Sequence, residues 1–134
     1  MKLHSIETGN FKLDGGAMFG VVPKVLWEKT NPADSQNRIE MSARCLLIED
    51  GEKLILIDAG LGNKQSEKFF SHYDRSGDMT LESSLASCGF DVEDITDVFL
   101  THLHFDHCGG ATIREGNKII PVFKNAKFWC SKSH

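Results

Sequence analysis

Two apolar runs lead straight into polar, chemically useful residues, and this arrangement restricts the folds open to the chain. The run Leu54–Ile57 ends in Asp58, and the run Val98–Leu100 ends in Thr101 and His102. A short, continuously apolar run of this kind is typical of a strand buried on both faces. In open α/β sheets, functional residues gather at the carboxyl ends of strands. We therefore expect Asp58 and His102 to lie at one edge of a sheet.

The other patterns predict strands that alternate with helices. A hairpin is expected where two β-rich runs flank Asp50-Gly51-Glu52, and a helix where Thr80 precedes Leu81, Leu85 and Cys88 and Gly89 follows. The class is α/β or α+β with a mixed sheet. The expected strands are Met1–Thr8, Ala43–Glu49, Lys53–Ile57, Val98–Leu100 and a final pair, Ile119–Phe123 with Lys127–Cys130. The expected helical segments are Lys64–Tyr73, the segment that begins after Thr80, one turn at Asp91–Ile95, and Cys108–Arg114.

Composition narrows the function classes. The 134 residues suit one domain, and 15 Lys and Arg against 19 Asp and Glu give a formal net charge of -4. An acidic balance argues against a general nucleic-acid binder, and no apolar run approaches the roughly 18 residues of a membrane span. With no signal segment, the expectation is a soluble cytoplasmic protein. The four cysteines form no CxxC pair and are expected to be free thiols.

The segment 101–107 carries the chemistry. It holds three of the six histidines, His102, His104 and His107, together with Asp106. Imidazole and carboxylate are the preferred zinc ligands outside thiolate sites. Because one tight loop cannot bring four ligands to one ion without strain, two ions about 3.5–4 Å apart, with two ligands each, fit better. Asp58 could orient a ligand histidine through its other ring nitrogen, or could simply be a turn residue.

The alternative for the whole cluster is a solvated polar loop, which the preceding apolar strand and the following Gly109-Gly110 make the weaker interpretation. Cys108 is not expected to be a ligand, because four hard or borderline ligands already stand beside it. The other histidines, His4, His72 and His134, are expected to be ordinary surface or core residues.

The segment His102–His107 reads HLHFDH, and this HxHxDH signature resembles the metallo-β-lactamase superfamily. The strand ending in Asp58-Ala59-Gly60 is similar to the superfamily as well. Stretches elsewhere look like one branch, the quorum-quenching lactonase-type metallo-hydrolases, so the likeness covers nearly the whole chain. These stretches are Asp14–Lys24 with Leu26-Trp27, Asn37–Ile39 and Lys118–Lys132.

The resemblance implies a role for each residue of the signature. His102 and His104 would bind one zinc ion, Asp106 and His107 a second, and Asp58 would support these ligands. It also implies an αββα sandwich of two similar halves, of which residues 1–134 look like the N-terminal half, a mixed sheet with helices on one face. The second half would supply a third His, a bridging Asp and a final His, and it or a partner chain would cover the open sheet face.

The function implied is hydrolysis of an ester-like bond by a hydroxide that two Zn²⁺ activate, with a lactone of the N-acyl homoserine type favoured. Asp106 would orient the hydroxide and pass a proton to the leaving alkoxide. The segment with Met18, Phe19 and Trp27 would line an acyl pocket or cover the sheet edge. The expected partner is a small ester or lactone, with neither nucleic acid nor membrane. Two alternatives stay open: an inactive or partner-dependent fragment, and an iron-dependent redox member, since mono-iron persulfide dioxygenases share the signature.

Overall fold

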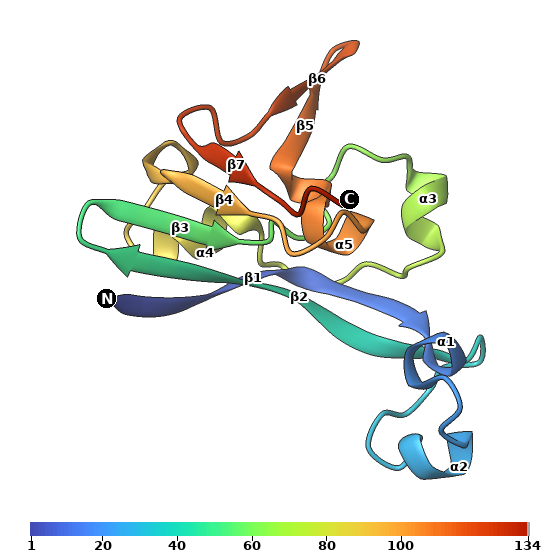
Figure 1. The fold of residues 1–134 in the computed structure, drawn as a ribbon. Helices are drawn as coiled ribbons and strands as arrows, with labels where there is room; N and C mark the ends of the chain where they lie inside the picture. Colours follow the sequence, from blue (N-terminus) through green and yellow to red (C-terminus); the bar gives the residue numbers. More distant parts are fainter. Residues whose placement is uncertain (134) are drawn as a thin grey trace.

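The computed structural model describes residues 1–133 and contains two sheets with short helices around them (Figure 1). The strands are β1 (Lys2–Asp14), β2 (Arg38–Asp50), β3 (Lys53–Ile57), β4 (Asp97–Phe99), β5 (Thr112–Glu115), β6 (Lys118–Pro121) and β7 (Lys127–Trp129). The helices are α1 (Gly15–Phe19), α2 (Lys24–Trp27), α3 (Glu67–Ser71), α4 (Leu81–Ser87) and α5 (Phe105–Cys108), with 3-10 turns η1 (Val92–Asp94) and η2 (Gly109–Ala111).

The main sheet is mixed, as the sequence predicts. Its strand order is β1-β2-β3-β4-β7, and β5 and β6 form a separate hairpin. The strands β1, β2 and β3 pair antiparallel, whereas β3, β4 and β7 pair parallel. This parallel part brings the carboxyl ends of β3 and β4 together at one edge, because Ile57 lies opposite Phe99.

The antiparallel part differs in length from the sequence prediction. The hairpin around Gly51 is confirmed, but β1 does not end at Gly9. The register of β1 against β2 shifts between Glu7 and Asn10, which marks a β-bulge, and Gly9 takes a φ of 104° there. A glycine tolerates that conformation, so the strand bends and continues to Asp14 instead of stopping.

The helix after Thr80 is confirmed. The Thr80 side chain accepts from the Ser83 backbone, and the Ser83 side chain accepts in return from the Thr80 backbone, so a capping box begins α4. Leu81 and Leu85 face the core, and the Ser84 hydroxyl donates to the Glu7 carbonyl of β1 at 2.6 Å. None of the helices in residues 1–133 has the length and apolar character needed to cross a bilayer.

Two predictions for the C-terminal third are wrong. Cys108–Arg114 is not a helix: α5 ends at Cys108, and Thr112 begins a strand that pairs with β6. Ile119–Phe123 and Lys127–Cys130 do not pair with each other either, because β6 pairs with β5 while β7 joins β4 in the main sheet. The turn at Gly116-Asn117 closes the β5–β6 hairpin, and that local pairing overrides the helical pattern.

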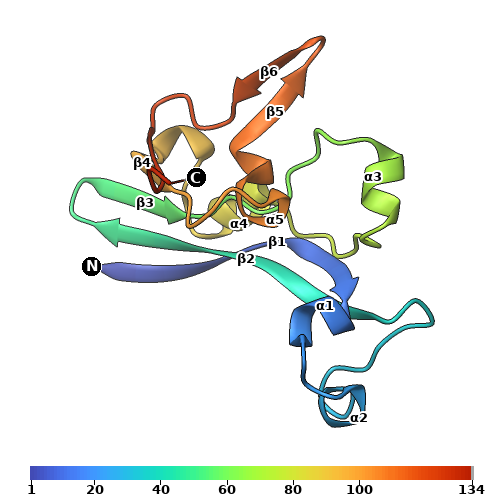
Figure 2. The ribbon, with the colours of Figure 1, turned by 45° about the vertical axis from the view of Figure 1, so that its right-hand side comes forward.

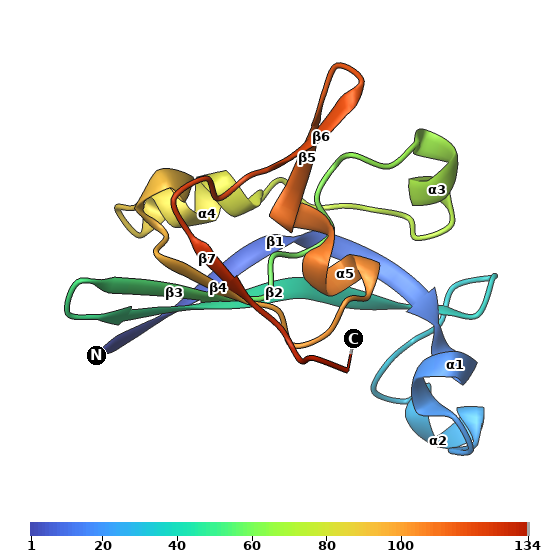
Figure 3. The same ribbon diagram turned by 45° about the horizontal axis from the view of Figure 1, so that its top comes forward.

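The core lies on the face of the sheet that α4 covers. Ile6, Leu47, Leu56, Leu85 and Val98 are fully buried there. The opposite face carries no helix among residues 1–133 (Figure 3). For this reason the prediction that Leu54–Ile57 is buried on both faces is wrong, since only Leu56 of the four is fully buried and the others are partly exposed.

The open face is apolar across several strands. The pairing register places Leu46, Ile57, Phe99 and Trp129 side by side on β2, β3, β4 and β7. Leu3 of β1 stands on the same face and is 60% exposed, while Phe99 and Trp129 are 45% and 52% exposed. Contiguous apolar exposure of this size is uncommon on soluble monomeric proteins.

The helices α1 and α2 form an arm beyond the end of β1 and β2 (Figure 2). Trp27 is buried, stacks on Phe19 with 5.0 Å between ring centroids, and lies against Gly15, where an added Cβ would overlap the indole. Met18 remains exposed. This packing holds the arm against the end of β1, and the two roles expected for the segment, lining an acyl pocket or covering the sheet edge, stay predictions.

Asp97 should make folding sensitive to acid. Its carboxylate accepts from Lys53 Nζ, Trp129 Nε1 and Thr96 Oγ1, each at 2.8 Å. The hydrogen bond from Lys53 is the main cause that lowers the Asp97 pKa from 3.8 to about 2. Because the folded pKa is the lower one, this stabilisation is present above pH 3.8 and is lost as the pH falls toward 2. Asp97→Asn should flatten acid unfolding in that range, followed by circular dichroism, whereas Asp78→Asn, at an exposed position, should not.

The four cysteines are free, and Cys45 should be the least reactive. Burial is the main cause that raises the pKa of the Cys45 thiol to about 12. Since the thiolate is the reactive form, a thiol reagent at pH 8 should modify exposed Cys130 quickly and Cys45 only after unfolding. Cys130→Ser should remove the fast phase, and rapid labelling of Cys45 in the folded protein would contradict the structure.

Candidate metal centre

The site is built where β3 and β4 end. The Asp58 N–H donates to the Phe99 carbonyl at 2.9 Å, which extends the strand pairing by one residue. Asp58 itself takes a φ of 61°, in the left-handed region that few residues other than glycine adopt, although aspartate tolerates it better than most. The turn aims its side chain at the loop that follows β4.

Asp58 connects the loop that follows β3 to the loop that follows β4. One of its carboxylate oxygens, Oδ1, accepts from Thr101 N at 2.8 Å, and both oxygens lie within 2.9 Å of Thr101 Oγ1. The other oxygen, Oδ2, lies 2.8 Å from His107 Nδ1. Of the two roles that the sequence leaves open for Asp58, this contact with His107 fits the orientation of a histidine, whereas the sequence predicts no role for Thr101. The feature of the sequence that could have indicated a role for Thr101 is its place directly after the strand that pairs with the strand before Asp58.

His102 and His104 lie on the same side of the loop. His102 Nε2 is 3.1 Å from His104 Nδ1, and their ring centroids are 4.6 Å apart. Thr101 Oγ1 lies 3.1 Å from Nδ1 of His102, the ring nitrogen that does not face His104, and this contact fixes the orientation of the imidazole. The two nitrogens that face each other are therefore the pair that an ion could share.

The short helix α5 supplies a second pair. His104 is the residue that precedes α5, and Asp106 and His107 lie within its single turn. His107 Nε2 is 3.4 Å from Asp106 Oδ2, and the His107 ring centroid is 4.0 Å from that of His102. The four expected residues thus converge beside Asp58.

The imidazole nitrogens and the carboxylate oxygen of these four residues are atoms that bind zinc, and they form two pairs. When His107 donates from Nδ1 to Asp58, its Nε2 keeps the lone pair that binds a metal. Each pair consists of imidazole or carboxylate donors. The first pair is His102 Nε2 with His104 Nδ1, and the second is His107 Nε2 with Asp106 Oδ2. No group of three or more His, Cys, Asp or Glu side chains in residues 1–133 is placed to hold one ion. A catalytic zinc site has three protein ligands, so each pair is one ligand short.

The other two histidines within residues 1–133, His4 and His72, do not complete either pair. His4 lies in β1, where Nε2 is 3.2 Å from Glu49 Oε2. His72 is exposed and follows α3. His134, expected to be an ordinary residue, lies outside the residues that the structure describes.

The profile of the metallo-beta-lactamase superfamily matches residues 39–131, a range that contains Asp58 and all four paired donors. The chain belongs to the metallo-β-lactamase superfamily. The α+β architecture with a mixed sheet agrees with this membership.

Solved structures of this superfamily resemble the chain over nearly its whole length. A probable metal-dependent hydrolase from Staphylococcus aureus is 39% identical over 95% of this chain, with a TM-score of 0.87. AidC, a dizinc quorum-quenching lactonase in complex with a product, is 30% identical over 98% of this chain, with a TM-score of 0.68. These matches cover only 45% and 44% of the two relatives.

A curated relative carries a different activity in its name. The exodeoxyribonuclease YycJ of Bacillus anthracis is 27% identical over 89 residues, which are 66% of this chain and 28% of that protein. The chain therefore spans less than half the length of each of these three relatives.

Proposed function

We propose that the chain is the N-terminal half of a zinc-dependent hydrolase that opens an ester-like bond, most favourably that of a lactone of the N-acyl homoserine type. One observation carries the proposal: two pairs of imidazole and carboxylate donors face each other at the carboxyl ends of β3 and β4. Two zinc ions bound there supply a water of lowered pKa and an electrophile for the substrate carbonyl.

Different residues of the chain have different roles in this proposal. His102 and His104 would hold one ion, and Asp106 and His107 would hold the other. Asp58 fixes the ring of His107 through Nδ1 and, through Thr101, the start of the loop. Asp106, which is 17% exposed at its side chain, can orient the attacking water and return a proton to the leaving alkoxide.

The lactone class rests on similarity over the full chain. AidC matches 98% of the chain at 30% identity, whereas the nuclease YycJ matches 66% at 27%. The formal net charge of -4 also suits a small substrate better than a polyanion. The proposal therefore commits to a small ester or lactone and not to DNA.

The missing ligands and the open sheet face point to the same second half. The apolar row Leu46, Ile57, Phe99 and Trp129 offers a surface for a second sheet. In the S. aureus relative, more than half of the protein lies outside the match, which covers 45% of it. We propose that a C-terminal half, or a partner chain, covers this face and completes both sets of ligands.

A completed enzyme tests the function. Fusing the unmatched half of the S. aureus protein to this chain should yield an enzyme with two zinc equivalents by mass spectrometry and turnover of an N-acyl homoserine lactone. A simple ester and single-stranded DNA are assayed in parallel. Turnover of DNA alone would overturn the substrate class, and one iron per site would favour the redox alternative.

Asp58→Ala should lower turnover of the completed enzyme about 10–100-fold, the usual cost of losing a residue that supports a metal ligand. The reason is that the His107 ring loses the hydrogen bond that fixes its orientation. Asp58→Asn, which keeps an oxygen toward Thr101, should be milder. Steady-state kinetics with metal content measured on the same samples decides this, and wild-type turnover in Asp58→Ala would remove Asp58 from the mechanism.

A further inference from the structure

The turn α5, which carries Asp106 and His107, is too short to hold itself in place. It has four residues, so its last carbonyl groups lack partners within the helix. The Gly109 carbonyl at its end accepts instead from Lys64 Nζ, a side chain of the loop that follows β3. Lys64 thus links the far side of α5 to the same loop that holds His107 through Asp58.

Next to this contact, the backbone of the loop after β3 lies close to the backbone at the end of α5 and is hydrogen-bonded to it. The Ala59 N–H donates to the His107 carbonyl at 2.7 Å, and the Gly110 N–H donates to the Gly60 carbonyl at 2.9 Å. A Cβ added at Gly109 would overlap the Leu61 carbonyl, and one at Gly110 would overlap the Ala59 carbonyl. Only glycine permits this approach, so the position of α5 depends on the loop against which it packs.

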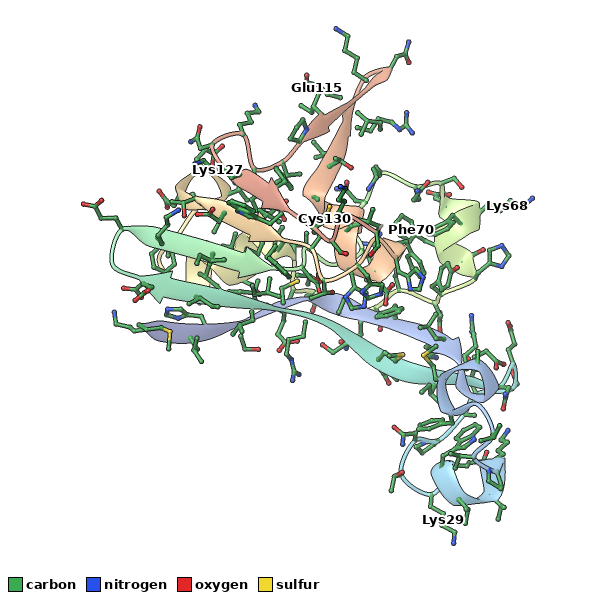
Figure 4. The ribbon with its side chains drawn as sticks, viewed as in Figure 1. Lys29, Lys68, Phe70, Glu115, Lys127 and Cys130 are labelled. Atoms are coloured by element: carbon green, nitrogen blue, oxygen red, sulfur yellow. The ribbon has the colours of Figure 1, made fainter. Side chains whose placement is uncertain are left out.

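Lys64 is unlike the solvated lysines of the surface. It is half-buried, and this burial is the main cause that lowers the pKa of its ammonium group. A buried ammonium group is costly unless a partner accepts from it, and the Gly109 carbonyl is the partner here. Lys68, by contrast, is exposed on α3 and points away from α5 (Figure 4).

We propose that Lys64 is a positioning residue that fixes α5 against the loop after β3 and so sets the place of Asp106 and His107 relative to His102 and His104. The inference rests on the proposed function for its metal consequence. Since His102 and His104 precede α5 and the Asp58 contact with Thr101 holds their loop separately, loss of Lys64 should weaken the Asp106–His107 pair alone.

The test compares Lys64→Met with Lys64→Arg and Lys68→Met in the 134-residue chain. Nuclear magnetic resonance follows amide hydrogen exchange at Ala59 and Gly110, and a Zn²⁺ titration follows the ¹⁵N signals of His102 Nε2 and His107 Nε2, which shift when the nitrogen itself coordinates the ion. In Lys64→Met, exchange at both amides should rise about tenfold, the size expected for one charge-assisted hydrogen bond. The coordination shift at His107 Nε2 should need about ten times more Zn²⁺, while the Zn²⁺ concentration that shifts His102 Nε2 should not change.

Lys64→Arg should restore most of both signals, and Lys68→Met should match the wild type. Exchange at the amides of β2 and β3 reports whether each variant is folded. Should Lys64→Met not fold, Lys64→Gln, which keeps a donor with a shorter reach, should still raise exchange at Ala59 and Gly110. Unchanged exchange at these two amides in a folded variant overturns the inference. Absence of a Zn²⁺ coordination shift at either ring in the wild type, even at high Zn²⁺ concentration, would instead count against the proposed function and leave the exchange comparison decisive for Lys64.

Discussion

His104→Ala in the completed enzyme should abolish most hydrolysis and remove about one zinc equivalent. Among residues 1–133, His104 Nδ1 is one of two donors placed for the first ion, the other being His102 Nε2 at 3.1 Å. Losing a ligand removes affinity and water activation together, so the loss should exceed the roughly 10–100-fold that loss of a supporting residue costs. Metal content by mass spectrometry and lactone turnover on the same preparation measure both effects.

The matched control is His72→Ala, which removes an exposed histidine that follows α3 and belongs to neither donor pair, and it should leave zinc content and turnover unchanged. Asp106→Ala should resemble His104→Ala but through the second ion, because Asp106 Oδ2 faces His107 Nε2. Unchanged turnover in His104→Ala with full zinc content would rule out the proposed mechanism.

Local signals in the sequence predicted those elements whose cause is itself local. Thr80 and Gly89 bound α4 because a capping side chain and a residue tolerant of positive φ act within a few residues. The hairpin at Gly51 was predicted for the same reason. The full extent of β1 was not, because Gly9 reads as a terminator unless pairing with β2 carries the strand through a bulge.

In the candidate site, too, the sequence predicts some residues and not others. Asp58 and the four donor residues could be found because their side chains are chemically distinctive and follow apolar strands. Lys64 could not be found, since its role depends on a carbonyl 45 residues away in sequence. Thr101 was overlooked because a threonine at a strand end is ordinary until Asp58 is seen to accept from it. Long-range contacts of this kind leave no periodic trace in the sequence.

The chain by itself should show no catalytic turnover and should hold zinc weakly. Each ion finds two donors among residues 1–133, whereas a hydrolytic zinc site needs three and an open position for water. The open sheet face adds a second reason. Fully burying a large apolar side chain is worth about 1.5–3 kcal/mol. Phe99 and Trp129 are 45% and 52% exposed, so this chain alone forgoes roughly half of that gain at each. The isolated chain should therefore be less stable than the completed enzyme or should associate through this face.

Zinc titration by calorimetry, lactone and ester assays, and light scattering on the purified 134-residue chain measure these outcomes, with the fusion to the S. aureus half as the reference. Leu46→Lys and Phe99→Lys place charges on the open face without touching the donors, so they should prevent self-association of the isolated chain and disrupt the fusion. Glu40→Lys, an exposed change on the same strand as Leu46, should do neither. Tight binding of two zinc ions by the isolated chain, with turnover equal to that of the fusion, would show that the half is self-sufficient, because its two donor pairs would then need nothing from a second half.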